Sequence, residues 1–149
     1  MTNEDLHGSD QSEMYIQQIV LQTLQHGGSA SKPRTFTFLP VMDVWSFPKY
    51  PSRTLILPGT ADLSKELKSF IIKNQIFLDE EECWLGTWLH PQTGEYYLDI
   101  ATGVEDLEEA YQLALKAGQK EGRQVVAMFN ARQNRTVYLR EFTTSNEQR

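Results

Sequence analysis

The stretch from Cys83 to Ala101, CWLGTWLHPQTGEYYLDIA, contains the clearest β-hairpin signal in this chain. Two runs rich in aromatic and aliphatic residues flank the turn residues Pro91–Gly94, a composition that favours two antiparallel strands. Because side chains alternate across a strand, a four-residue turn fixes both the register and the two faces of the hairpin. The predicted pairs are His90–Glu95, Trp88–Tyr97 and Gly86–Asp99.

One face of this hairpin is mostly apolar and is expected to pack in the core. It consists of Cys83, Leu85, Thr87, Leu89, Tyr96, Leu98 and Ile100. The other face, called the aromatic face below, consists of Trp84, Trp88, His90, Glu95, Tyr97 and Asp99. Large rings with polar tips either pack beneath a second layer or form a surface that binds a partner.

A spacing of one aromatic residue, nine further residues and a leucine occurs three times. The segments are Trp45–Leu55, Trp88–Leu98 and Phe129–Leu139. Helical patterns precede the second and third segments, and a period of about 40 residues is typical of stacked supersecondary units. The sequence therefore predicts an α+β fold of three helix–β-hairpin units (αββ repeated), with an antiparallel-rich sheet packed against helices.

A single α+β domain is predicted over residues 12–142, between a disordered N-terminus (1–11) and a disordered C-terminus (143–149). A chain of 149 residues can bury a core without disulfides or metals. Apolar residues at helical spacing predict the first helix over 12–26. The Gly/Ser-rich segment GGSASKP (27–33) is expected to be a flexible linker that tethers this helix.

Local signals set the expected ends of the later elements. A helix is expected to begin after Asp62, and another after a capping box formed by Thr102 and Glu105, with Gly118 at its end. A last hairpin is predicted over 124–130 and 135–142.

The charge distribution limits the classes of partner. The net charge of −6 argues against non-specific nucleic-acid binding as the main function, because such affinity depends on neutralising phosphates. Basic residues are concentrated in segments 31–60 and 120–149, beside aromatic residues, which leaves single-stranded nucleic acid as an alternative partner. These residues are Lys32, Arg34, Lys49, Arg53, Arg123, Arg132, Arg135 and Arg140.

Motifs for catalysis or metal binding are missing from the sequence. Cys83 and His90 are seven residues apart on one strand and point to opposite faces, so we expect an inert, buried thiol and no Cys-His dyad. The acidic run Asp79–Glu82 lacks the alternation of a calcium loop and is interpreted as a solvated turn. His90, Glu95 and Asp99 share a face and support a second alternative, a small enzyme. No catalytic residue, metal or cofactor is predicted.

The cellular setting follows from what the sequence lacks. No apolar run approaches the roughly 20 residues of a membrane span, and the acidic, polar N-terminus is unlike a secretory signal. Cys83 is the single cysteine, which fits a reducing compartment. We therefore expect a cytoplasmic protein without membrane contact.

Segment 86–119, GTWLHPQTGEYYLDIATGVEDLEEAYQLALKAGQ, combines Trp-x-x-Pro-x-Thr-Gly-x-x-Tyr-Leu-Asp with an acidic helix that ends in Gln. This pattern resembles one in small uncharacterised bacterial proteins, some of them cyanobacterial or carried by mobile elements. The resemblance implies no activity and no site residue.

The leading hypothesis is a non-enzymatic protein-interaction module, acting as an adaptor, regulator or inhibitor through the aromatic face. Because a monomer rarely exposes so large an apolar patch, a homodimer is also predicted. Arg132 and Arg135 flank the tip of the last predicted hairpin, where they are expected to form a charged contact loop for an acidic partner. The run Asp79–Glu82 of a second copy is one such partner.

Overall fold

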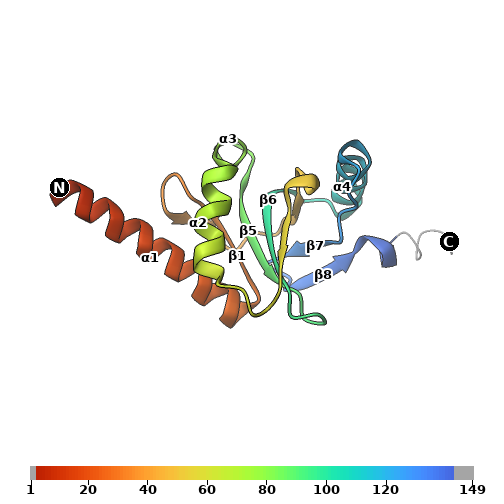
Figure 1. Ribbon diagram of the computed structural model, residues 1–149. Helices are drawn as coiled ribbons and strands as arrows, with labels where there is room; N and C mark the ends of the chain where they lie inside the picture. The colour runs from red at the N-terminus through yellow and green to blue at the C-terminus, as the bar shows by residue number, and fades with distance from the viewer. Residues whose placement is uncertain (1–2, 143–149) are drawn as a thin grey trace.

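The computed structural model describes the backbone of residues 3–142 and the side chains of residues 10–142. It has the expected α+β composition (Figure 1). The helices are α1 (Asn3–His26), the 3-10 turn η1 (Pro51–Arg53), α2 (Leu63–Lys73), α3 (Gln75–Leu78) and α4 (Leu107–Glu121). The strands are β1 (Gly28–Lys32), β2 (Thr37–Phe38), β3 (Trp45–Pro48), β4 (Leu55–Leu57), β5 (Trp84–Leu89), β6 (Tyr96–Val104), β7 (Ala127–Asn130) and β8 (Arg135–Tyr138).

All strand pairs are antiparallel, in the order β2-β1-β5-β6-β3-β7-β8, and β4 also pairs with β6. The predicted hairpin is β5–β6, and its register is confirmed by the pairs Trp88–Tyr97 and Gly86–Asp99. At the turn, the His90 N–H donates to the Glu95 carbonyl at 2.8 Å. The turn and the alternation of side chains are both local, which explains why the sequence specified them correctly.

The long strand β6 organises the sheet, because β5 pairs along one edge while β3 and β4 share the other. Pro48 of β3 lies opposite Ala101, and Leu55 of β4 lies opposite Leu98. Residues 49–54 therefore stand opposite only two residues of β6, and we call this segment the 49–54 bulge. Pro51, which has no backbone N–H to contribute to a strand ladder, begins the η1 turn inside it.

The three-unit αββ repeat is not what the structure shows. Trp45 starts β3, which pairs with β6 and β7, and β3 does not pair with β4. The first segment is thus one interrupted strand laid along β6, whereas the second and third are hairpins. The interruption at Pro48 and Pro51 is the physical reason for the difference.

The prediction of a flexible linker over 27–33 was wrong, because most of this segment forms strand β1, which pairs with β5. Gly28 is required here because a Cβ at this position would lie 2.6 Å from the Thr87 carbonyl oxygen. Ser31 is buried and shares a 2.7 Å hydrogen bond with the Tyr15 hydroxyl. Small residues in this segment therefore permit close packing, and they do not mark a flexible tether.

The chain ends and the fourth helix differ from expectation in detail. Residues 3–11 belong to α1, while the predicted disordered segment 143–149 lies outside the described residues. The N-cap of α4 is Asp106, whose carboxylate accepts from the Glu109 N–H, and Thr102 lies within β6. The helix continues past Gly118 and ends at Gly122, which has a left-handed φ of 69°.

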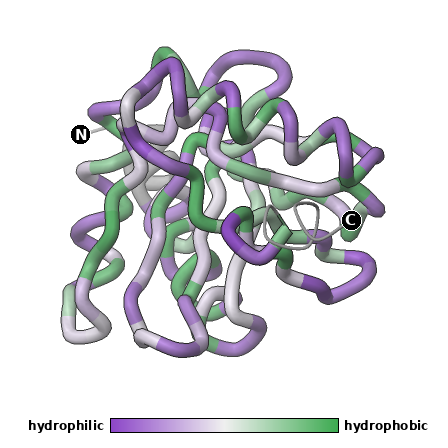
Figure 2. Tube along the Cα trace, turned by 90° about the vertical axis from the view of Figure 1, so that its right-hand side faces the viewer, coloured by the Kyte–Doolittle hydropathy of each residue, from purple (hydrophilic) through white to green (hydrophobic). Residues whose placement is uncertain are grey.

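The helices and the core cover one face of the sheet. Side chains of α1, α2 and α3 pack on Leu85, Leu98 and Ile100, while α4 packs on Trp45 and Phe47 in a second cluster. These strand residues share one side by alternation and strand pairing, which confirms the predicted core face. In Figure 2 hydrophilic residues gather in several of the peripheral loops. No helix in the described part of the chain combines the length and the apolar character of a membrane span.

The core assignment predicts the effect of truncating Leu98, which is fully buried. Leu98→Ala should lower the free energy of unfolding by about 2 to 5 kcal/mol, since it removes buried methyl groups and leaves a cavity. The matched control is Ile76→Ala, because Ile76 is 82% exposed. Urea denaturation measures both, and equal stabilities of the two variants would contradict the assigned core.

Candidate functional site

The sheet curls strongly, so its uncovered face is concave. Trp88 of β5 and Tyr138 of β8 have ring centroids 6.2 Å apart, although β6, β3 and β7 separate their strands in the sheet order. In a flat sheet four strand spacings would place them about 19 Å apart. The far edge of the sheet therefore folds back towards the tip of the β5–β6 hairpin.

Four of the six residues of the aromatic face line the cavity that this curl creates. Trp84, Trp88, Tyr97 and Asp99 all border the cavity, whose volume is about 360 Å³. The loop between β2 and β3, strand β7 and the last turn of α1 supply further wall. Volumes of about 300 to 1,000 Å³ with mostly apolar walls are typical of small-molecule sites. The face is thus neither covered by a helix nor a flat outer surface.

His90 belongs to an aromatic cluster at the edge of this wall. Its ring lies 4.7 Å from the Trp88 ring, 5.9 Å from Tyr97 and 6.0 Å from Tyr138, centroid to centroid. The Gln92 N–H donates to its Nδ1 at 3.2 Å. The side chain is 7% exposed, so it fills space and joins β8 to the hairpin.

The structure does not bring the predicted acid–base residues into one reactive group. Glu95 is the register partner of His90, and Asp99 lies four residues further along β6, about 13 Å at the usual rise of a strand. Proton transfer between His90 and Asp99 needs hydrogen-bond distance. The shared face predicted from the sequence is correct, but the spacing along the strand separates the two ends.

Asp99 instead joins two residues that the sequence analysis did not assign to this site, Thr54 and Arg123. The Thr54 hydroxyl donates to Asp99 Oδ1 at 2.6 Å, and Arg123 Nη1 donates to the Thr54 carbonyl at 2.6 Å. Burial raises the pKa of Asp99 to about 6, while the Thr54 hydrogen bond and the Arg123 charge oppose that rise. Asp99 is half-buried and borders the cavity.

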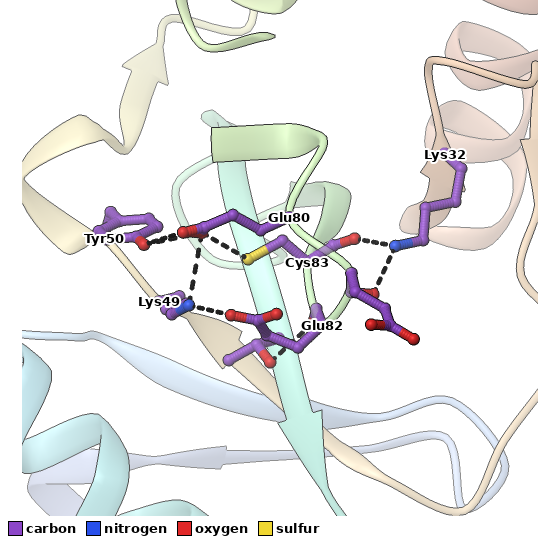
Figure 3. Close-up of polar contacts among 8 residues, drawn as sticks. Lys32, Lys49, Tyr50, Glu80, Glu82 and Cys83 are labelled. Atoms are coloured by element: carbon purple, nitrogen blue, oxygen red, sulfur yellow. Dashed lines mark hydrogen bonds and ion pairs between the residues drawn. The ribbon is translucent and has the colours of Figure 1, made fainter. Parts of the chain in front are cut away.

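A second polar cluster lies on the opposite face, around the acidic run 79–82. Lys49 forms ion pairs with Glu80 and Glu82, and the Tyr50 hydroxyl donates to Glu80 at 2.7 Å (Figure 3). The hydrogen bond to Glu82 is the main reason that the pKa of Lys49 is raised. The Lys49 ammonium group therefore balances part of the negative charge of Glu80 and Glu82.

The run forms the expected turn before β5, and Asp79, Glu81 and Glu82 are exposed to solvent. Lys32 Nζ donates to the carbonyls of Glu81 and Cys83, and the Thr102 hydroxyl donates to the Glu82 carbonyl at 2.9 Å. The turn is therefore held by contacts from β1, β6 and the 49–54 bulge. Among the described residues, Glu80, Glu82 and Cys83 are the one group with metal-ligand geometry, within 4.8 Å of one another.

Cys83 fits the expectation of an inert thiol. Its side chain is fully buried and unpaired with another cysteine. Burial raises the pKa of the thiol to about 11, so the nucleophilic thiolate is scarce at neutral pH. The residue contributes to the core and to the hydrogen bond with Glu80.

The charged contact loop lies in the β7–β8 turn, where Arg132 and Arg135 are exposed. Asp43 accepts hydrogen bonds from Asn130 and Gln133, and its pKa is lowered mainly by the Asn130 bond, with a smaller contribution from Arg132. The Arg135 guanidinium lies 5.6 Å from the Trp45 ring centroid. The turn is thus fixed from within the chain, and its role in binding a partner stays a prediction.

Several basic residues of segments 31–60 and 120–149 are also engaged within the chain. Arg53 donates to Asn74 at 3.1 Å and stacks over the Phe77 ring. Lys32, Lys49 and Arg123 make the contacts described above. Their side chains support the fold, which leaves fewer cations for a nucleic-acid surface.

Comparison with known proteins gives no family model, curated protein or solved structure that matches this chain. The resemblance of segment 86–119 to small bacterial proteins stays a prediction.

The raised pKa of Asp99 predicts a specific dependence of stability on pH. Between about pH 4 and pH 6 the folded carboxyl keeps a proton that the unfolded one has lost, so stability falls as pH rises through this window. The shift in pKa corresponds to about 3 kcal/mol. Relative to Asp99→Asn, the native chain should therefore lose about this much between pH 4 and pH 8 in urea denaturation.

Thr54 variants provide the control for this measurement. Because the Thr54 hydroxyl lowers the pKa of Asp99, Thr54→Val should enlarge the pH-dependent loss, whereas Thr54→Ser should keep it close to the native value. A stability difference between the native chain and Asp99→Asn that stays constant over the pH range would show that Asp99 is not held in this environment.

Proposed function

We propose that this protein is a non-enzymatic binding module that takes up a small, mostly apolar molecule in its concave cavity. The observation that carries the proposal is the position of Trp84, Trp88 and Tyr97, whose rings border one cavity of about 360 Å³. Aromatic side chains supply large apolar contact area, and apolar residues outnumber polar ones in the wall, as is usual in a ligand pocket.

The side-chain pattern across the strands supports space for a ligand. Ala30, Gly86 and Asp99 are register neighbours on β1, β5 and β6, and all three border the cavity. This row is flanked on β5 by Trp84 and Trp88. Ala30 and Gly86 contribute little side-chain volume here, which leaves space for a ligand, whereas close packing would call for larger side chains.

The protein-interaction hypothesis takes a narrower form in this proposal. The rings of the aromatic face border the cavity, so the partner best suited to them is a molecule small enough to enter. A protein partner and the expected homodimer stay predictions. Sedimentation of the full chain at tens of micromolar measures the homodimer directly.

The proposal predicts binding of a neutral, environment-sensitive naphthalene dye by the native chain at one site per chain, with quenching of tryptophan fluorescence. Ala30→Phe should weaken binding at least tenfold, because the new ring fills the hollow beside Gly86. The matched control, Gln112→Phe, adds the same ring at an exposed position of α4 and should leave the affinity unchanged.

Circular dichroism melting of both variants checks that the fold is kept. Equal dye affinities in the native chain and folded Ala30→Phe would contradict the proposal, as would binding of several dye molecules per chain without saturation.

A further inference from the structure

Gly86 of β5 lies in the wall of the cavity. Trp84 and Trp88 lie on the same face of β5 on either side of this glycine, with Cα atoms about 13 Å apart at the usual strand rise. Gly86 has no side chain, and its neighbour Ala30 on β1 contributes only a methyl group. A cavity bordered by Trp84, Trp88 and Tyr97 favours a flat molecule, since aromatic rings gain contact area by stacking or edge-to-face packing.

Polar groups of opposite charge border this cavity. Asp99 is the register partner of Gly86, and its Oδ1 is engaged by Thr54 while the described residues give its Oδ2 no partner. Arg123 uses Nη1 to bind the Thr54 carbonyl, and a guanidinium has further N–H donors. Both Asp99 and Arg123 border the cavity. The site therefore offers the Asp99 carboxylate as an acceptor and the Arg123 guanidinium as a donor, and Thr54 binds both side chains.

This pairing discriminates by charge. A cationic ligand at Asp99 is repelled by Arg123, and an anionic ligand at Arg123 is repelled by Asp99. A charged group also loses its hydration on entering the cavity, and it regains little when attraction and repulsion offset each other. A neutral group that donates to Asp99 and accepts from Arg123 satisfies both and avoids these costs.

Building on the proposed function, we infer that the ligand is a neutral, planar aromatic molecule with an amide-like edge that donates a hydrogen bond to Asp99 and accepts one from Arg123. Carboxamides, lactams and ring systems with the donor–acceptor edge of a nucleobase have this chemistry. The aromatic wall of the cavity contacts the flat ring, and the polar edge fixes its orientation.

Three probes of nearly equal shape test the inference on the full chain: naphthalene carboxamide, the cationic carboxamidine and the anionic carboxylate. Titrations at pH 7.5, followed by tryptophan fluorescence and calorimetry, should give the carboxamide at least a tenfold lower Kd than either charged probe. The native chain alone suffices for this ranking, so the test does not depend on any variant folding.

Two variants should then change the ranking in opposite directions. Asp99→Asn removes the negative charge and should strengthen carboxylate binding about tenfold. The carboxamidine should still bind weakly to this variant, because Arg123 continues to repel it. Arg123→Met removes the positive charge and should strengthen carboxamidine binding about tenfold. Arg123→Lys keeps the charge and should still exclude the carboxamidine. The matched controls are Asp79→Asn and Arg34→Met, at exposed positions away from the cavity.

The outcomes separate this inference from the proposed function. If probes bind and are blocked by Ala30→Phe, but a charged probe binds as tightly as the carboxamide, the inference is overturned and the proposed function stands. The same holds if neither charge-removing variant changes the ranking. If no probe and no neutral dye binds the native chain, both fail.

Discussion

The 49–54 bulge is the constraint on which the rest of the structure depends. Six residues opposite two of β6 cannot remain in the sheet plane, so their side chains leave in both directions. Lys49 and Tyr50 reach the acidic turn before β5 on the core side. Ser52 binds Glu121 at the end of α4, at 2.7 Å.

The rest of the bulge joins α2 and the cavity. Arg53 binds Asn74, the C-cap of α2, and Thr54 reaches Asp99 and Arg123 on the concave side. The 49–54 bulge thus contacts both the helices and the sheet. Because Thr54 is fixed in this way, the opposite charges beside it are held in place before any ligand arrives, which lowers the cost of ordering the site.

The sequence specified what is local and missed what depends on distant contacts. The register of the β5–β6 hairpin and its two faces follow from one turn and from alternation, and both are correct. The curl of the sheet brings Tyr138 to Trp88 from far along the chain, and no local pattern encodes it. The aromatic face was therefore recognised, but its position inside a cavity was not. Thr54 had no signal of its own, and Arg123 appeared only as one of several basic residues. The segment Gly27–Ser31 was wrongly predicted to be a flexible linker, because small residues occur both in flexible segments and in closely packed strands.

The most direct test of the account is a crystal structure of the full chain grown with naphthalene carboxamide. The account predicts the naphthalene ring in the cavity beside Gly86, against its aromatic wall, with its amide within hydrogen-bond distance of Asp99 and Arg123. Density for the compound elsewhere on the molecule would contradict the central claim. So would a structure in which the indoles of Trp84 and Trp88 close over Gly86 and leave no space for a ligand.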